Sequence, residues 1–245
     1  KENIMAKEKL TQQEQVRRQK MQELRDMGID PFGQAFDVKD NTKDIREQYG
    51  NCTKEELEEK NIHVQLAGRI MLRRRKGKVA FMDINDKFGK IQLYVRKDVV
   101  GEDVYEIVKR GDLGDIIGVE GVLMETDTGE LTIRVEQYTH LTKALRPLPE
   151  KFHGLTDTEE RFRRRYLDLI MNEEARKVAF TRPKVIRSIQ HYLDNLGYTE
   201  VETPMMNSIL GGASAKPFIT HFNALDKDFY LRIATELNLK RLIVG

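Results

Sequence analysis

The alternation of apolar and polar residues between positions 62 and 142 is the feature that most constrains the fold of this chain of 245 residues. A period of two residues predicts half-buried strands, because successive side chains of a strand point to opposite faces. The alternation indicates a short helix at 102–109 and strands at 64–72, 79–85, 91–96, 115–125 and 130–138. Three strands, a helix and two strands are the element order of an OB-fold barrel over 62–142.

Residues 1–61 precede this segment, and we expect them to form an N-terminal helical extension. Its clearest part is a helix over 1–27, because this run contains no Gly or Pro and Gly28 stands where a C-cap belongs. The apolar stripe of this helix is thin, which suggests a helix that lies on another domain or on a partner. The alternative, which we favour, is a solvated surface helix. Residues 143–171 should form a connector that is extended around Pro147 and Pro149.

From residue 172 the apolar period becomes helical, which marks the beginning of a second domain over 172–245. We expect a helix with Pro183 in its first turn and Gly197 as its C-cap. A helix should also begin near Thr235. Strands are indicated at 198–203, 218–222 and 229–233, and the run 242–245 resembles a strand that is cut short. The predicted fold class is therefore α+β.

Composition excludes several classes of protein. The chain has 42 Lys and Arg against 40 Asp and Glu, which excludes a simple polybasic tail. No apolar run approaches the roughly 20 residues of a membrane span, and no signal peptide is visible. Cys52 is the single cysteine, so no internal disulfide can form, which fits a reducing, cytoplasmic compartment. One Cys and five scattered His give no zinc pattern.

Strand parity gathers aromatic and polar side chains on one outer surface of the expected barrel. If the apolar residues of each strand point inward, Phe81, Gln92 and Glu130 point outward. An exposed ring can stack on a base, Gln and Glu can read base edges, and Arg can neutralise phosphate. These side chains favour single-stranded nucleic acid as the ligand; the alternative is a charged turn with Phe81 tucked under a loop. The basic residues of the expected turn are Arg69, Arg73, Arg74, Arg75, Lys76 and Lys78.

The second region contains two features that could bind a small ligand. Gly211 and Gly212 could let backbone groups approach it closely, because glycine has no side chain in the way. Glu236, near the start of a helix, could receive an ammonium group. The alternative for Glu236 is compensation of the helix dipole, which is common for glutamate in a first turn.

Ordered motifs along the chain connect these features. They are RRQK (17–20), GIDPF (28–32), GVEG (118–121), TKALRPLP (142–149), KFHGL (151–155), RYLDL (165–169), EVETPMM (200–206), GGASAKPFITH (211–221) and LNLKRL (237–242). With these motifs the chain resembles bacterial-type class II lysyl-tRNA synthetases over essentially its whole length.

The resemblance implies an N-terminal helix and a five-stranded OB-fold barrel that binds the anticodon, followed by the start of a class II antiparallel-sheet catalytic domain. Family residues at the anticodon fall on Arg69, Arg74, Phe81, Gln92 and Glu130. Their implied roles are stacking for Phe81, recognition of the central uridine for Gln92 and Glu130, and phosphate contacts for the two arginines.

The resemblance also implies two functions for residues 172–245. The helix at 182–196 with residues 200–204 matches class II motif 1, which builds the homodimer interface in the family. Gly212 and Glu236 match residues that bind the α-amino end of lysine. The expected interface residues are Arg182, Ile186, Ile189 and Pro204.

The implied reaction is the ATP-dependent ligation of L-lysine to tRNA(Lys) through lysyl-adenylate, with Mg²⁺ on the ATP phosphates. Motifs 2 and 3 of the family are absent, so ATP and Mg²⁺ would be bound mainly by residues beyond Gly245. We therefore expect no catalytic residue and no metal ligand within this chain, which alone should not activate lysine. The expected partners are the tRNA(Lys) anticodon loop, L-lysine, ATP and a second copy, with no membrane.

Three alternatives remain open. The chain could be a non-catalytic module for RNA binding and dimerisation. It could belong to an aspartyl- or asparaginyl-type class II synthetase. It could also belong to a lysine-transferring relative that modifies lipid.

Overall fold

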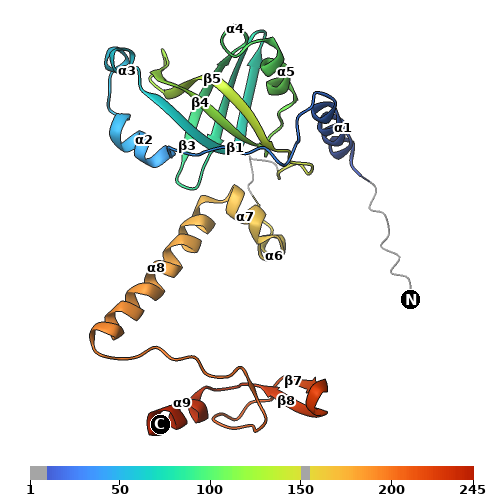
Figure 1. Ribbon diagram of the computed structural model, residues 1–245, viewed down its shortest axis with the longest axis vertical. Helices are drawn as coiled ribbons and strands as arrows, with labels where there is room; N and C mark the ends of the chain where they lie inside the picture. The colour runs from blue at the N-terminus through green and yellow to red at the C-terminus, as the bar shows by residue number, and fades with distance from the viewer. Residues whose placement is uncertain (1–9, 150–154) are drawn as a thin grey trace. The chain divides into compact units, whose positions relative to one another are not determined.

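The computed structural model describes residues 10–149 and 155–245 (Figure 1). The first nine residues of the expected helix, and positions 151–154 of the KFHGL motif, lie outside the described residues. The internal contacts divide the chain into two compact units, residues 1–167 and 168–245.

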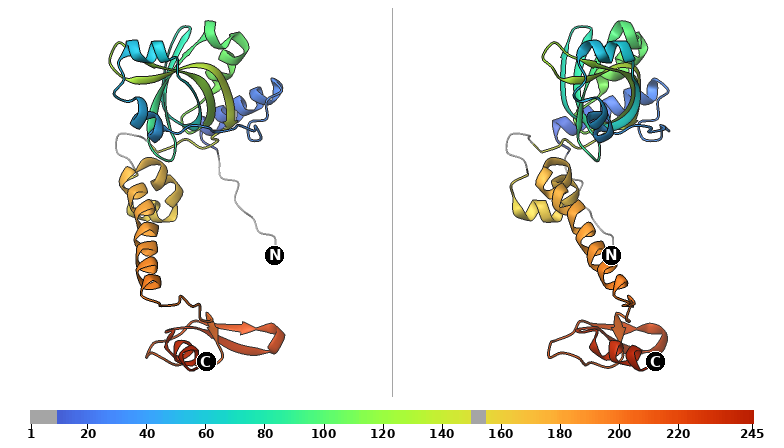
Figure 2. Two further views of the ribbon diagram at one scale, coloured as in Figure 1. Left: turned by 60° about the vertical axis from the view of Figure 1, so that its left-hand side comes forward. Right: turned by 90° about the vertical axis from the view of Figure 1, so that its left-hand side faces the viewer.

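A closed five-stranded barrel forms the centre of the first unit (Figure 2). The strands follow one another around it in the order β1-β2-β3-β5-β4. The β3–β5 pair is parallel and the other pairs are antiparallel. This topology confirms the predicted OB-fold. The strands are β1 (His63–Lys76), β2 (Val79–Asn85), β3 (Lys90–Arg96), β4 (Ile116–Glu125) and β5 (Leu131–Thr142).

The alternation of burial in β2 and β3 follows the sequence pattern residue by residue. Their inward side chains are fully buried, and they pack with apolar residues of the other strands into one core. Burial of each large aliphatic side chain contributes about 1.5–3 kcal/mol to the free energy of unfolding, so the barrel core is the main source of stability in this unit. Core residues of this kind include Leu66, Met82, Ile84, Leu93 and Ile133.

Strand β1 differs from the prediction at its second half. Its register against β2 shifts between Ile70 and Leu72, so Met71 is buried and Leu72 is only half-buried. A bulge adds one residue to a strand and reverses the parity of all residues that follow. The strand then continues to Lys76, so most of the basic residues lie on β1 and not in a turn.

Several helices surround the barrel. They are α1 (Gln12–Asp26), α2 (Thr42–Tyr49), α3 (Lys54–Lys60), α4 (Lys97–Val100) and α5 (Glu102–Arg110). The expected helices at 1–27 and 102–109 correspond to α1 and α5, and Gly28 adopts the positive φ of a C-terminal glycine (78°). Helices α2 and α3 were not predicted individually, because each is short and has one fully buried apolar anchor, Ile45 or Leu57.

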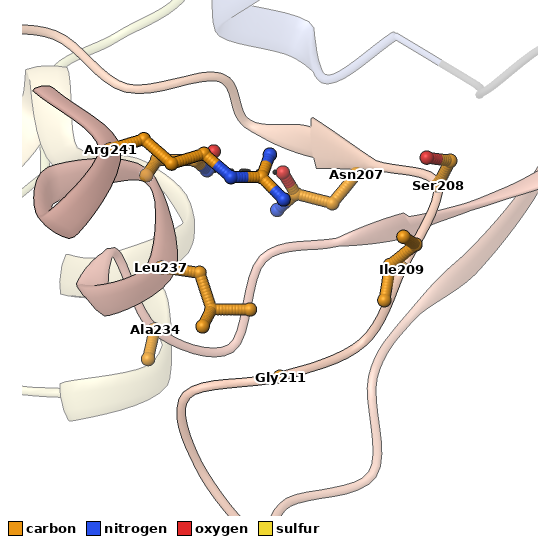
Figure 3. A pocket seen from close by; sticks show the side chains of 8 residues that line it. Asn207, Ser208, Ile209, Gly211, Ala234, Leu237 and Arg241 are labelled. Atoms are coloured by element: carbon orange, nitrogen blue, oxygen red, sulfur yellow. Dashed lines mark hydrogen bonds between the residues drawn. The ribbon is translucent and has the colours of Figure 1, made fainter. Parts of the chain in front are cut away.

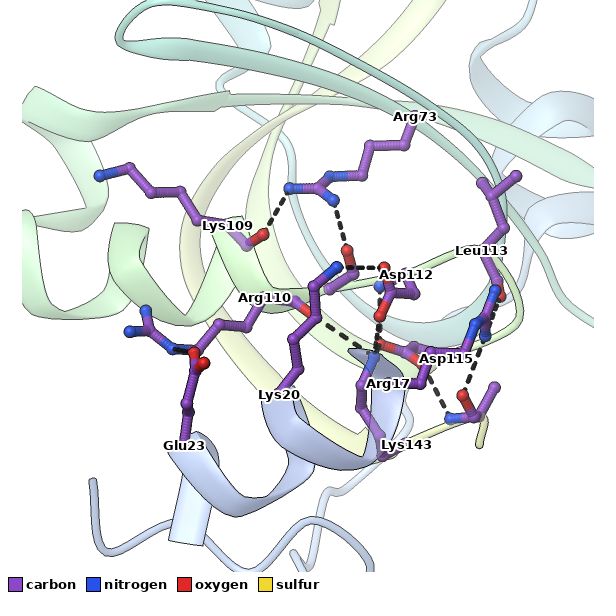
Figure 4. Close-up of polar contacts among 12 residues, drawn as sticks. Arg17, Lys20, Glu23, Arg73, Lys109, Arg110, Asp112, Leu113, Asp115 and Lys143 are labelled. Atoms are coloured by element: carbon purple, nitrogen blue, oxygen red, sulfur yellow. Dashed lines mark hydrogen bonds and ion pairs between the residues drawn. The ribbon is translucent and has the colours of Figure 1, made fainter. Parts of the chain in front are cut away.

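Helix α1 is attached to the barrel, so the expectation of a solvated surface helix was wrong (Figure 4). Buried Arg17 donates hydrogen bonds to the carbonyl oxygens of Leu113 (3.0 Å) and Ala144 (2.9 Å). Lys20 Nζ lies 2.5 Å from a carboxylate oxygen of Asp112. These contacts come from charged side chains, and they agree with the alternative that the thin apolar stripe suggested, a helix that lies on another part of the protein.

Asp112 connects α1 to a buried ion pair at the end of β5 (Figure 4). The Lys143 ammonium is fully buried, 2.6 Å from Asp112 and 2.7 Å from Asp115, whose side chain is also fully buried. Asp115 further accepts a hydrogen bond from the backbone N–H of Ala144 (2.8 Å). Buried charges are tolerated only when they are paired and hydrogen-bonded, as these are.

The expected extended connector contains two helices, α6 (Thr158–Arg163) and α7 (Arg165–Met171). Asp157 caps α6, since its carboxylate accepts a hydrogen bond from the backbone N–H of Glu160 (2.7 Å). Residues 143–149, which contain the two prolines, lie outside helices and strands, whereas the part from residue 158 onward is helical.

The second unit contains a long helix and a small antiparallel sheet with strand order β6-β8-β7. Its elements are α8 (Glu173–Asn195), β6 (Met206–Asn207), β7 (Ile219–Phe222), a short 3₁₀ helix (Asn223–Leu225), β8 (Lys227–Leu231) and α9 (Glu236–Val244).

Three expectations for this unit were wrong. Helix α8 begins at Glu173, so Pro183 lies inside it, where the missing N–H leaves one intrahelical hydrogen bond unmade. Residues 198–203 form no strand. Residues 242–244 belong to helix α9, although the apolar and partly β-branched composition of this run had suggested a strand. Gly197 does end α8, with φ at 83°.

Candidate nucleic-acid interface

The outer face of β2 and β3 carries the side chains that alternate with the core. Cross-strand register sets Phe81 opposite Tyr94 and Asp83 opposite Gln92, all of them half-buried. The rings of Phe81 and Tyr94 lie with centroids 4.9 Å apart and planes inclined at 34°. The Tyr94 ring contacts the Phe81 ring and widens the aromatic surface. Its outward parity was visible in the sequence.

Gln92 is tied to the start of β5 by a buried hydroxyl. Thr132 Oγ1 lies 3.0 Å from Gln92 Oε1 and 3.0 Å from the backbone oxygen of Glu130. Thr132 is on the outward side of β5 but is fully buried, because these polar groups cover it. The hydroxyl has one hydrogen to donate, and a hydrogen bond to Gln92 Oε1 restricts rotation of the Gln92 amide.

Glu130 precedes β5 and contacts a residue from outside the barrel. Its Oε1 lies 3.2 Å from Nη2 of Arg46, on α2. The Arg46 Nε donates a hydrogen bond to the carbonyl oxygen of Lys90 (3.0 Å). No sequence pattern pointed to Arg46, because it is far from Glu130 along the chain.

The six basic residues separate into two groups. Arg74 pairs with Phe81 in the β1–β2 register and is exposed, as are Arg75, Lys76 and Lys78. Arg74 and Lys76 pair with Phe81 and Val79, so they share the outward parity of Phe81 and form a positive edge beside the aromatic pair. Such an edge suits a phosphate backbone.

Arg69 and Arg73 are engaged with the protein backbone. Arg69 Nη1 donates to the carbonyl oxygen of Gly114 (2.7 Å), and burial lowers the pKa of its guanidinium. Arg73 donates to the carbonyls of Val108 (3.1 Å) and Lys109 (2.9 Å), and also to that of Gly111. Arg73 thus caps the C-terminal end of α5, because it satisfies carbonyls that have no partner within the helix.

The structure brings Gly212 and Glu236 together in the second unit. Gly212 has φ of 89°, and a Cβ there would lie 3.4 Å from Glu236 Cβ and 3.9 Å from Glu236 Oε2. Only glycine therefore fits this position without strain. The Glu236 carboxylate also lies 2.5 Å from Lys240 Nζ one turn along α9, and this hydrogen bond lowers the pKa of Glu236.

A pocket adjoins this loop on α9 (Figure 3). The Asn238 amide donates to the Asn207 side-chain oxygen (3.1 Å) across it, and Leu237 lies so close that a Cβ on Gly211 would meet its Cδ1 at 2.4 Å. Gly211 therefore lets the loop pack against the helix. The lining residues are Asn207, Ser208, Ile209, Gly211, Ala234, Leu237, Asn238 and Arg241.

The residues expected at a dimer interface are exposed within this chain. Arg182, Ile186 and Ile189 lie on α8, where Ile186 is 47% and Ile189 55% exposed. Pro204 lies in the irregular segment that follows α8 and is also exposed. Exposed isoleucines at a spacing of three residues share one helix face.

Among residues 10–149 and 155–245, no helix is long and apolar enough to cross a membrane. In the same described part of the chain, no group of three or more His, Cys, Asp or Glu side chains is arranged to hold a metal ion.

Comparison with known families defines the class of protein to which this fold and this face belong. Residues 64–141 match the OB-fold nucleic acid binding domain, and residues 157–245 match the tRNA synthetases class II (D, K and N). The chain therefore combines an OB-fold nucleic-acid-binding domain with part of a class II tRNA synthetase domain.

The relatives narrow this class. Lysine–tRNA ligases of Bacillus thuringiensis (strain Al Hakam), Bacillus cereus (strain AH820) and Bacillus anthracis are each 56% identical over 241 residues, 98% of this chain. The chain is thus a homologue of the lysine–tRNA ligases. It spans 48% of the length of each of these relatives.

Proposed function

We propose that this chain recognises the anticodon loop of a lysine tRNA and serves in the ATP-dependent ligation of L-lysine to that tRNA. The observation that carries the proposal is the single outer face of β2, β3 and the start of β5. It combines an aromatic pair with an amide, a carboxylate and a positive edge.

In this proposal each side chain has a distinct role toward an unpaired anticodon. Phe81 stacks on a base, since every base offers a π-face to an aromatic ring. Gln92 and Glu130 read the edge of the central uridine, an unstacked base that a protein can hydrogen-bond directly. Arg74 neutralises phosphate. Arg69 keeps its backbone contact with Gly114 and would reach phosphate only with part of its guanidinium.

The lysine pocket is the second element of the proposal. The backbone of Gly212 and the carboxylate of Glu236 would receive the α-amino group of lysine, since a carboxylate and an ammonium form a charge-assisted pair. In this structure the Glu236 carboxylate forms an ion pair with Lys240, so the ammonium group of the substrate would compete with Lys240 for this carboxylate. Dipole compensation by Glu236 at the start of α9 is compatible with this role.

The ligase would form lysyl-adenylate from lysine and ATP and then acylate the tRNA, as a cytoplasmic homodimer built on α8. ATP is the co-substrate, and Mg²⁺ supplies charge neutralisation on its phosphates. The described residues offer no cluster that fits Mg²⁺, so the proposal places no metal contact on them. The names of the relatives favour lysine over aspartate or asparagine, which the class II family also covers.

Binding of an anticodon stem-loop tests the proposal on this chain. A synthetic stem-loop with three uridines in the anticodon should bind more tightly than one with cytidine at the central position, at one fixed salt concentration. Equal affinities would refute uridine recognition. Pyrophosphate exchange by the full-length ligase that depends on aspartate and not on lysine would refute the substrate assignment.

A further inference from the structure

Arg46 contacts the proposed RNA-binding face from outside the barrel. Its Nη2 lies 3.2 Å from Glu130 Oε1, and its Nε donates to the carbonyl oxygen of Lys90 at 3.0 Å. These two nitrogens lie on the same edge of the planar guanidinium. Because both are engaged, the plane of the group is fixed, which a single contact from a lysine could not achieve.

The helix that carries Arg46 is itself fixed to the barrel. The Asp86 carboxylate, in the β2–β3 turn, accepts hydrogen bonds from the backbone N–H (2.7 Å) and the hydroxyl (2.6 Å) of Thr42 at the start of α2. Thr42 is fully buried, and Ile45 packs into the barrel core. Arg46 follows Ile45 directly, so its backbone has little freedom to move.

The Glu130 carboxylate is held by one oxygen and open at the other. Oε1 contacts Arg46, while Oε2 makes no hydrogen bond to any residue in the described part of the chain. Glu130 is 41% exposed, so Oε2 can accept a hydrogen bond from a ligand. A free glutamate side chain would lose rotamer freedom on binding, whereas a glutamate that is already held loses less.

We infer that Arg46 is a positioning residue that presents the Glu130 carboxylate to the N–H of an unpaired base. The inference rests on the proposed recognition of a tRNA anticodon. Arg46 acts through Glu130 and does not bind the RNA itself. The competing explanation is a direct contact between Arg46 and a phosphate.

A double-mutant cycle separates the two explanations. The variants are Arg46→Gln, Glu130→Gln and both together, and the measurement is the ratio of dissociation constants for stem-loops with central uridine and central cytidine. We expect Arg46→Gln to reduce this ratio roughly two- to fivefold, the size of a half-exposed ion pair. In the Glu130→Gln background it should change nothing.

Lys43→Gln is the matched control, because it removes the same charge from the same helix, and among residues 10–149 and 155–245 Lys43 forms an ion pair only with Glu47. It should leave the ratio unchanged. The inference is overturned if Arg46→Gln weakens both stem-loops by one common factor, or if its effect persists in the Glu130→Gln background. Either result would indicate a phosphate contact.

A crystal structure of the Arg46→Gln variant without RNA gives an independent test. The Glu130 carboxylate should leave the position that it has beside Arg46 in the unaltered protein, while Thr42 and Asp86 stay in place. If Glu130 keeps its position, the inference is wrong. If the unaltered protein fails to distinguish uridine from cytidine, the proposed function fails, and this structural comparison still decides the role of Arg46.

Discussion

At the scale of single residues, the aromatic pair is the most direct target on the proposed RNA face. Phe81→Ala removes the ring whose centroid lies 4.9 Å from that of Tyr94, while the backbone of β2 stays paired on both sides. We expect weaker binding of the anticodon stem-loop by about 1–3 kcal/mol, because base stacking is lost. Fluorescence anisotropy at fixed salt measures the effect. Phe32→Ala, at an exposed Phe in the loop after α1, should bind like the unaltered protein.

Thr132 offers a test of how Gln92 is held. Thr132→Val has nearly the same shape but lacks the hydroxyl that lies 3.0 Å from Gln92 Oε1. The Gln92 amide should then rotate more freely, and discrimination between central uridine and cytidine should fall. Thr132→Ser keeps the hydroxyl and should retain most of the discrimination. Equal behaviour of the two variants in the binding assay would argue against this role.

His140 makes the stability of the first unit depend on pH. Burial lowers the pKa of its imidazole below 6.5, and neither ring nitrogen has a hydrogen-bond partner among the described residues. Asp112, Asp115 and Lys143 also act on this ring. The unfolded chain therefore binds a proton at a pH at which the folded chain does not. We therefore expect the contribution of His140 to the free energy of unfolding to be complete above pH 6.5 and to fall as the pH decreases below it.

The slope in this window is at most about 1.4 kcal/mol per pH unit for one group. His140→Phe keeps a ring in the same site but does not titrate, so its slope should be smaller. Urea denaturation at several pH values below 6.5 measures both slopes. A slope that is unchanged in His140→Phe would assign the pH dependence to other groups.

At the scale of elements, a buried charge network joins α1, the start of β4 and the end of β5 (Figure 4). Asp115→Asn would remove a buried negative charge that lies 2.7 Å from the Lys143 ammonium. Breaking a buried pair leaves the other charge poorly compensated, so we expect a loss of about 3 kcal/mol in the free energy of unfolding. Circular dichroism during urea denaturation measures this loss.

Asp127→Asn is the control for this prediction, because the Asp127–Lys54 pair is on the surface and the Asp127 side chain is 97% exposed. Its effect should stay within about 0.5 kcal/mol. Equal effects of the two substitutions would show that the network around Lys143 adds no special stability.

At the scale of the whole molecule, the exposed face of α8 predicts self-association. Ile186→Asp and Ile189→Asp place a charge on the face that the resemblance assigns to the dimer, and burial of an unpaired charge is costly. Sedimentation velocity should show a dimer for the unaltered chain and a monomer for the double variant. Lys184→Asp, on the opposite side of the helix from Ile186, should remain dimeric. A monomeric unaltered chain would contradict the assignment.

The period of the sequence determined the barrel and its outer face. Alternation in β2 and β3 set Phe81 and Gln92 outward, since the side-chain direction of a paired strand depends only on its position in the repeat. The glycines that follow α1 and α8 could also be predicted from the local sequence. Gly28 and Gly197 adopt positive φ, which other residues rarely do. The motif strings led to the family that the relatives bear out.

Only the tertiary structure decided which charged groups are free and which are engaged. A bulge at Met71 reversed the parity of β1, so Arg73 caps α5 while Arg74 stays exposed beside Phe81. Arg46 reaches Glu130 from a helix whose position depends on Asp86, in a turn that is distant in sequence. The physical reason is one of range. The direction of side chains in a strand and the end of a helix depend on residues that are close in sequence. A long charged side chain instead pairs with a group that the closed barrel brings within a few ångströms of it, and that group can be far away in sequence.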